Sequence, residues 1–281
     1  MAPSVAPSVA TSALVDRYPG GQTPTGVRLN ATIDTLLQHR SVRGYKPDAL
    51  PAGTLETLVM AAQSAATSSN LQTWSVIAVT DADAKAACAA LAGGQGQIAQ
   101  CPLFLLFLAD LSRLNRVADQ ADLPRAGNDW LEMFLVAAID ASLAAQNAAI
   151  AAESLGLGTV YIGAMRNKPE EVAALFGLPE ACVAVFGLCV GYASEGHEGS
   201  IKPRLPQSTV LHLGRYDTAP ERSAISDYDG AMAVFYEREG MNVKTPWTVH
   251  SARRVSGPES LSGRHELMPA LRRMGFLKAE A

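Results

Sequence analysis

The stretch that decides the fold spans residues 129–154 and reads DWLEMFLVAAIDASLAAQNAAIAAES. Apolar side chains such as Leu131, Phe134, Ile139 and Leu143 almost surround the single long helix that this stretch predicts. A helix that is apolar on every side is buried on every side, and its many alanines allow neighbouring helices to approach closely. We therefore expect a core helix that also lines an interface between two subunits.

The composition favours an oligomer and argues against a nucleic-acid-binding protein. Of the 281 residues, 48% are hydrophobic and 18% are charged, whereas charged residues make up about 25% of an average domain. A chain with so little charge is expected to hide part of its surface against another subunit. The net charge is −4, but nucleic acid as the main partner would require a broad basic face.

The cysteines and histidines indicate neither disulfides nor a metal centre. The four cysteines are Cys88, Cys101, Cys182 and Cys189, and none of them has CxxC spacing or a histidine at zinc-ligand spacing. The five histidines are scattered and form no HExxH motif. We expect buried thiols in a reducing compartment, a cytoplasmic protein and no metal.

The ends of the chain are expected to differ from its centre. Residues 1–20 lack the basic n-region and continuous apolar core of a secretory signal. The purest apolar run, at 103–109, is much shorter than the roughly 20 residues of a membrane span, so no membrane segment is expected. We predict a disordered extension over 1–28 and a single domain over 29–281, with a polar, basic C-terminal excursion at 219–281.

The remaining elements do not alternate regularly. Helices are expected at 30–38, from 54 to before 67, and at 82–91, 169–176, 225–238 and 266–275; strands at 74–79, 103–108 and 183–190; and a strand or turn at 160–163. Residues 112–128 are polar and are expected to form a mobile excursion. Because the order is irregular, a doubly wound sheet is disfavoured. The predicted fold class is α+β, with a mixed sheet flanked by helices.

Two short segments concentrate cations in this acidic chain. The first cation segment is His39-Arg40-Ser41-Val42-Arg43, and the second is Lys202-Pro203-Arg204-Leu205-Pro206. Arginine is a planar fork of donors suited to bidentate contact with phosphate, so the two segments could meet on one small anion. Solvated surface charge is the alternative, and the prolines next to Lys202 and Arg204 weigh against it.

Neutral hydrogen-bonding residues lie in two further loops. One contains Ser68-Ser69-Asn70-Leu71-Gln72 and the other Gly93-Gly94-Gln95-Gly96. The glycine run is not a GxGxxG motif after a strand, and no Walker lysine follows it. Its glycines either end a helix and form a turn, or they place Gln95 against a ligand. Together with the cations, these loops suggest a phosphorylated cofactor with a polar edge.

These segments, taken in order, resemble the nitroreductase superfamily, and closely its group A of bacterial oxygen-insensitive nitroreductases and FMN-dependent NAD(P)H oxidoreductases. The matching text comprises the two cation segments, Thr67–Gln72, Gly93–Gln95, Ala145–Gly163 and Phe186–Gly191. Each motif alone is weak, whereas the ordered set over residues 30–275 is specific. Residues 1–28 lie outside the family pattern.

The resemblance implies an intertwined homodimer with one FMN in each of two interface clefts. It assigns the phosphate and ribityl contacts to His39, Arg40, Ser41, Arg43, Lys202 and Arg204. It assigns contacts made from the partner subunit to Thr67, Ser68, Ser69, Asn70 and Gln72. It lines the isoalloxazine ring with Gln95, Tyr161, Ile162, Gly163 and Ala164, and it brings Glu132 of the long helix near the flavin.

The C-terminal excursion departs from the family at one position. Group A members usually carry arginines there for the 2′-phosphate of NADPH, but Val243 stands where one is expected. Arg238 and Lys244 remain as candidates for binding NAD(P)H. We therefore expect NADPH to be favoured over NADH, but by less than about 100-fold.

The activity implied by the resemblance is transfer of two electrons from NAD(P)H to nitroaromatics, quinones or free flavin by a ping-pong mechanism. Flavin N5 would carry the hydride, and no side chain would act as a catalytic acid or base. Small electron-poor aromatic or quinone acceptors are the expected partners. Two alternatives stay open: a flavin-binding sensor or carrier with slow turnover, and a fragmenting or dehalogenating branch in which the 112–128 excursion would be a lid.

Overall fold

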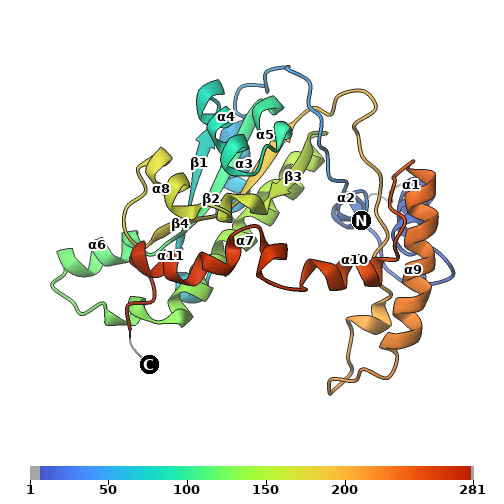
Figure 1. The fold of residues 1–281 in the computed structure, drawn as a ribbon. Helices are drawn as coiled ribbons and strands as arrows, with labels where there is room; N and C mark the ends of the chain where they lie inside the picture. The colour runs from blue at the N-terminus through green and yellow to red at the C-terminus, as the bar shows by residue number, and fades with distance from the viewer. Residues whose placement is uncertain (1–6, 280–281) are drawn as a thin grey trace. The chain divides into compact units, whose positions relative to one another are not determined.

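The computed structural model describes residues 7–279, and the chain divides into two compact units (Figure 1). The first, which we call the α unit, consists of Met1–Arg40 and Gly199–Leu261. The second, the sheet unit, consists of Ser41–Glu198 and Ser262–Ala281. The chain first leaves the α unit between Arg40 and Ser41, which is inside the first cation segment. The single domain over 29–281 stays a prediction.

The sheet unit is built on a four-stranded sheet in the order β1-β2-β4-β3, in which neighbouring strands are antiparallel. Its strands are β1 (Trp74–Val79), β2 (Leu103–Asp110), β3 (Gly158–Ile162) and β4 (Cys182–Gly191). An isolated parallel bridge outside these strands joins Ser41 to Thr159 of β3. The α+β fold class is confirmed.

Strand β2 separates two cores, because its side chains alternate between the two faces of the sheet. On one face, Leu103, Leu105 and Phe107 pack with α3 (Thr54–Gln63) and α7 (Leu131–Ser154). On the other face, Phe104, Leu106 and Leu108 of β2 pack under α4 (Ala82–Leu91), α5 (Gly96–Gln100) and α8 (Pro169–Phe176). The sheet is therefore covered by helices on both faces.

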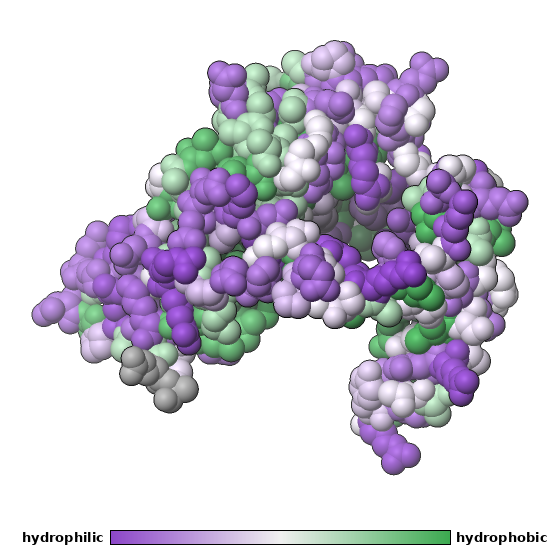
Figure 2. Space-filling model, in the orientation of Figure 1, coloured by the Kyte–Doolittle hydropathy of each residue, from purple (hydrophilic) through white to green (hydrophobic). Residues whose placement is uncertain are grey.

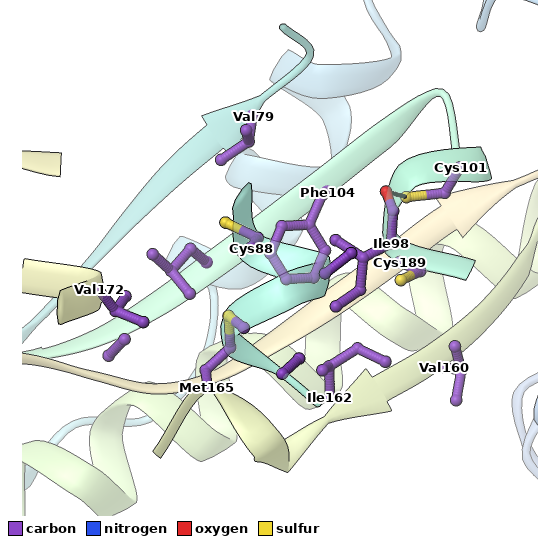
Figure 3. Close-up of a cluster of buried hydrophobic side chains, with 14 of the residues drawn as sticks. Val79, Cys88, Ile98, Cys101, Phe104, Val160, Ile162, Met165, Val172 and Cys189 are labelled. Atoms are coloured by element: carbon purple, nitrogen blue, oxygen red, sulfur yellow. Dashed lines mark hydrogen bonds between the residues drawn. The ribbon is translucent and has the colours of Figure 1, made fainter. Parts of the chain in front are cut away.

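Phe104 lies at the centre of the second core, among Cys88, Ile98 and Met165 (Figure 3). A Cβ atom on Gly187 of β4 would lie only 2.0 Å from Cζ of this ring, so the ring requires glycine at that position. All four cysteines are buried and free, as predicted. Burial raises the pKa of the Cys88 thiol to about 11, so this thiol stays protonated and unreactive near neutral pH.

Helix α7 confirms the predicted long helix at 129–154. Its buried face consists of Val136, Ala137, Asp140, Ala141, Ala144, Ala145, Ala148, Ala149 and Ala152, and these small side chains let the helix lie close to the sheet. By length and composition α7 could also cross a membrane, although 44% of its most apolar 18-residue window is buried inside the protein. Core helices of soluble proteins meet the same criteria.

The α unit contains α1 (Pro7–Arg17), α2 (Ala31–Leu37), α9 (Glu221–Arg238) and α10 (Trp247–Arg254). The Asn30 side chain accepts a hydrogen bond from the backbone N–H of Ile33 at 2.9 Å, which is the predicted start of α2. Tyr228, Met232 and Phe235 of α9 form the apolar centre of this unit.

Within residues 7–279, four helices differ from the sequence-based expectations, and two of them, α5 and α10, lie where no element was predicted. Helix α1 lies within the extension predicted to be disordered, of which residues 1–6 are outside the described part of the chain. Helix α6 (Ser112–Gln120) occupies the predicted mobile excursion, and its start is held by Asp110, whose Oδ1 accepts from the backbone N–H of Ser112 at 3.0 Å. The last helix, α11 (Leu267–Arg273), packs Leu271 with Phe276 in the sheet unit.

Short 3-10 turns complete the structure at Ser68–Asn70, Ala126–Asp129, Gly163–Arg166, Gln207–Thr209, Pro258–Leu261 and Arg264–Glu266.

Candidate functional site

The second cation segment runs over α9 in the α unit. The Tyr228 hydroxyl donates to the carbonyl of Pro203 at 3.0 Å, and the Lys202 ammonium lies 5.9 Å from the centroid of the Phe235 ring. Pro203 and Pro206 are buried, while Lys202 and Arg204 are exposed. Pro203 and the partly buried Leu205 therefore seat the segment on the helix, and its two cations stay exposed.

A buried arginine that the sequence analysis did not single out joins the two cation segments inside the α unit. Arg17 of α1 is only 5% exposed. Its guanidinium donates to the carbonyls of Leu37, His39 and Lys202, each at 2.8 Å, and its own carbonyl accepts from the backbone N–H of Arg204 at 2.9 Å. Residues 37–39 and 202–204 are thus held next to each other.

A cavity of about 460 Å³ lies in the α unit beside these segments. Its lining is Ser12, Ala13, Asp16, Gln38, Arg40, Gly199, Ser200, Ile201, Arg238 and Glu239. Arg40 and Arg238 therefore lie at the same cavity, whereas Lys244 does not line it. Arg238 pairs with Asp16 at 3.3 Å and with Glu239 at 3.0 Å, so two carboxylates already balance its charge.

In the sheet unit, the rest of the first cation segment lies along β3. The backbone N–H of Val42 donates to the carbonyl of Thr159 at 2.9 Å, and Val42 is 3% exposed. Side chains alternate along such an extended segment, so Ser41 and Arg43 point away from the core that holds Val42. Arg43 is exposed, and Ser41 is half-buried.

The neutral loop between α3 and β1 has an unusual backbone. Ser69, Asn70 and Gln72 have φ values of 48°, 56° and 52°, which non-glycine residues rarely adopt. Ser68, Ser69, Asn70 and Gln72 are exposed, and Thr67 is half-buried. The predicted hydrogen-bonding residues are thus displayed at the surface on a strained loop.

Asp140 of α7 holds this loop from beneath. It is 1% exposed, and its carboxylate accepts from the backbone N–H of Ser68 at 3.1 Å, from that of Thr73 at 3.1 Å and from the Thr73 hydroxyl at 3.0 Å. Sequence reasoning missed this role, since a lone aspartate inside an apolar helix matches no motif. Its partners become visible only when the loop is folded against the helix.

Arg113 supports the other end of the loop. Its guanidinium donates to the carbonyl of Gln72 at 2.7 Å, to that of Trp74 at 3.2 Å and to the Ser75 hydroxyl at 2.7 Å. Arg113 also lies 3.7 Å from Asp110. Burial raises the pKa of Asp110, but hydrogen bonds from Ser112 and Ser75 and the Arg113 charge outweigh burial and keep that pKa below its usual value. Asp110 is therefore ionised at neutral pH.

The remaining predicted residues of the sheet unit lie on several elements. Tyr161 is in β3, where its ring meets Phe186 edge-on at 5.2 Å and burial, followed by the nearby Glu153, raises the pKa of its hydroxyl. Ile162 ends the strand, and Gly163 and Ala164 begin the following turn. Gln95 is half-buried and donates to the carbonyl of Ala92 at 3.2 Å.

The Gly93-Gly94 pair has φ values of 78° and 81°, so it forms the turn after α4, which was one of the two interpretations left open. Glu132 is exposed in the first turn of α7.

Among residues 7–279, no group of three or more His, Cys, Asp or Glu side chains is placed to hold a metal ion.

Two family models match this chain. The model described as the nitroreductase family matches residues 36–192, and the model of the C-terminal domain of that family matches residues 202–279. Helix α1 lies outside both matches.

Relatives match along most of their length. The NADPH-flavin oxidoreductase of Vibrio harveyi is 34% identical over 251 residues, which are 89% of this chain and 100% of the relative. The FMN reductase (NADPH) of Bacillus subtilis is 39% identical over 219 residues, 77% of this chain and 87% of the relative. Among solved structures, NfrA2 of B. megaterium superposes with a TM-score of 0.84 at 39% identity, covering 90% of this chain and 100% of that one.

Proposed function

Since the chain belongs to the nitroreductase family, we propose that it is an FMN-dependent oxidoreductase that takes electrons from NAD(P)H. Relatives at 34% and 39% identity carry the names NADPH-flavin oxidoreductase and FMN reductase (NADPH). A solved relative, the NADPH:FMN oxidoreductase of Vibrio harveyi in complex with NAD+, superposes with a TM-score of 0.79. These names support both the cofactor and the electron donor.

The observation that carries the proposal is that Arg17 holds residues 37–39 and 202–204 next to each other in the α unit. Arg17 fixes the backbone of residues 37–39 to that of residues 202–204, and Arg40, Lys202 and Arg204 beside it are exposed. Exposed cations on a fixed backbone suit a phosphate, because their geometry is set before the anion arrives. The donor set therefore fits the phosphate end of FMN.

We assign the cofactor contacts as follows. The phosphate and ribityl chain are bound by His39, Arg40, Ser41, Arg43, Lys202 and Arg204. The ring and ribityl chain are bound by Thr67, Ser68, Ser69, Asn70, Gln72, Gln95, Glu132, Tyr161, Ile162, Gly163 and Ala164. The strained loop held by Asp140 and Arg113 is rigid enough to orient its donors before binding.

When bound, FMN supplies a two-electron acceptor and donor within one cofactor. The chain's own residues bind and orient it, and a second planar molecule would stack beside the ring. We infer that the donor NAD(P)H and the acceptor occupy this space in turn, which is a ping-pong mechanism. The acceptors are small electron-poor compounds, namely nitroaromatics, quinones or free flavin.

The protein is proposed to act as a homodimer. Four apolar side chains of α7 recur every fourth residue and stay exposed in the single chain: Leu131 at 53%, Leu135 at 46%, Ile139 at 56% and Leu143 at 44%. This spacing places them on one side of the helix, and Figure 2 shows apolar surface where the first turns of α7 lie in Figure 1. A second copy of the chain would bury this stripe.

Light scattering tests the dimer. We expect the purified protein to be a dimer, and Ile139→Asp to give a monomer that has lost FMN, because the partner's loop at 67–72 would be missing. Val117→Asp is the control, since Val117 is 55% exposed on the polar helix α6. A stable monomer that retains FMN would contradict the proposal.

The reaction is tested by separating its two halves. Under anaerobic conditions NADPH alone should bleach the visible absorbance of the bound flavin, and a quinone or nitroaromatic added after removal of NADP⁺ should restore it. Bleaching that requires the acceptor to be present would exclude the ping-pong order. Failure of NADPH and NADH to bleach the flavin at all would exclude the oxidoreductase and favour a flavin-binding carrier.

A cytoplasmic location remains part of the proposal, and the four buried free thiols agree with it.

A further inference from the structure

We propose that Arg17, in the N-terminal helix outside the family matches, is a positioning residue for the cofactor's phosphate. Arg17 positions the phosphate by fixing the two phosphate-binding segments of the α unit to each other, and it makes no contact of its own with the phosphate. The inference rests on the proposed function, because it presumes that these segments bind FMN.

The hydrogen bonds of Arg17 join three parts of the chain. Its guanidinium reaches the carbonyls of Leu37 and His39 on one side and the carbonyl of Lys202 on the other, all at 2.8 Å. The Arg17 carbonyl accepts from the backbone N–H of Arg204. One residue therefore contacts the backbone at both segments that carry the predicted phosphate-binding cations.

One of the carbonyls that Arg17 contacts, that of Leu37, needs a partner from outside its own helix. Leu37 is the last residue of α2, and the last carbonyls of a helix have no partner within it. A cation at the C-terminal end of a helix also interacts favourably with the helix dipole. The planar guanidinium fork can meet several carbonyls at once, which a lysine ammonium on a flexible stem does less well.

Helix α1 is seated firmly enough for Arg17 to act as a fixed point. Ala13 and Leu14 are only 2% and 9% exposed. On the solvent side, Asp16 pairs with Arg238 of α9. Arg17 itself is buried. If its side chain is changed, water cannot replace the lost hydrogen bonds, and the backbone segments that it holds are expected to move.

The consequence for binding follows from which atoms Arg17 holds. The carbonyls of His39 and Lys202 belong to residues assigned to the phosphate, and Arg40 and Arg204 are their neighbours in the chain. If the two segments separated, their cations could not both reach one phosphate, and a misplacement of about 1 Å already has a large effect at such sites. The isoalloxazine contacts assigned to the sheet unit would be unaffected.

The test compares FMN with riboflavin, which has the same ring but no phosphate. Dissociation constants of both ligands are measured by fluorescence quenching for the full-length protein, for Arg17→Ala and for Arg17→Lys. Arg28→Ala is the control, because Arg28 is an exposed arginine of the same N-terminal region. Circular dichroism establishes that each variant is folded.

We expect Arg17→Ala to weaken FMN binding at least about 10-fold and to change riboflavin binding less than about 2-fold. Arg17→Lys should give an intermediate loss, and it keeps the inference testable if Arg17→Ala does not fold. Equal weakening of both ligands, or unchanged FMN binding in both variants, would overturn the inference. The proposed function fails separately, if the unmodified protein binds FMN no better than riboflavin.

Discussion

Two regions of this molecule are held in place by a buried charged side chain, and the two charges are of opposite sign. In the sheet unit a buried carboxylate, Asp140, accepts from backbone and hydroxyl donors of the loop at 67–73. In the α unit a buried guanidinium, Arg17, donates to the carbonyls of two segments that are far apart in sequence. The first region displays neutral hydrogen-bonding side chains, and the second displays cations.

Under the proposed function, the two regions bind the two ends of one cofactor. A loop in a strained left-handed conformation needs a strong acceptor to hold its N–H groups, and Asp140 supplies it from a helix of the family core. The cation segments need a donor between their carbonyls, and Arg17 supplies it from a helix outside the family matches. Binding of the ring is thus expected to depend on the family's fold, and binding of the phosphate on the family's cation segments together with Arg17 of this chain.

The largest effect is expected when the support of the loop is removed. Asp140→Ala leaves two backbone N–H groups and the Thr73 hydroxyl without their acceptor in a buried place, so it should lower the free energy of unfolding by about 2–4 kcal/mol. Urea denaturation followed by circular dichroism measures the change.

Asp83→Ala serves as the control, because Asp83 is an exposed carboxylate on α4 and surface changes usually stay within about 0.5 kcal/mol. If the two variants unfolded at the same urea concentration, Asp140 would not hold the loop.

The next effect concerns the displayed cations. Arg204→Ala in the α unit and Arg43→Ala in the sheet unit should each weaken FMN binding about 10- to 150-fold, since each loses a charge-assisted hydrogen bond. Lysine should not fully rescue either position, because bidentate geometry is lost. Fluorescence titration with FMN measures the affinities.

The exposed Arg222 of α9 is the matched control for the charge change, and Arg222→Ala should bind FMN normally. Unchanged affinity in both the Arg43 and the Arg204 variants would remove these residues from the phosphate site and leave the cation segments as surface charge.

The smallest effect is expected at the electron donor. NADPH should be favoured over NADH by less than about 100-fold, and Arg238→Ala should raise the KM for NADPH while leaving turnover with NADH nearly unchanged. The structure gives a reason for a modest preference, because Asp16 and Glu239 already pair with Arg238. Steady-state kinetics with both donors measures it.

The variant Asp16→Asn tests whether the ion pair with Asp16 weakens the interaction of Arg238 with NADPH. Removing one of the competing carboxylates should lower the KM for NADPH by about 2- to 5-fold, the size of an exposed ion pair. A better rate with NADH than with NADPH in the unmodified protein would show that Arg238 has another role.

Periodicity and capping were enough to predict most of the fold. The alanines and large apolar residues of 129–154 predicted α7, Asn30 predicted the start of α2, and the helices at 82–91 and 169–176 are found at those residues. Helices α1, α5, α6 and α10 were not predicted, and for α6 the structure gives a physical reason. Helix α6 is polar, and its start depends on the Asp110 side chain and not on a capping residue of its own.

The candidate site could be predicted only where side chains face a ligand. Clustered cations and the Ser-Ser-Asn loop carry a chemical pattern that is visible in sequence. Arg17 and Asp140 do not, because each acts on backbone atoms that only folding brings near it. The Lys202 carbonyl that Arg17 contacts lies 185 residues away, and the Ser68 N–H that Asp140 contacts lies 72 residues away. No local pattern encodes such contacts.

The central claim is that the chain holds FMN through its phosphate, and the most direct test is to identify and quantify the flavin. Denaturing the purified protein should release one FMN per chain, and the refolded or flavin-stripped protein should bind riboflavin at least about 100-fold more weakly than FMN. Release of FAD, no flavin after reconstitution, or equal affinity for FMN and riboflavin would contradict the account.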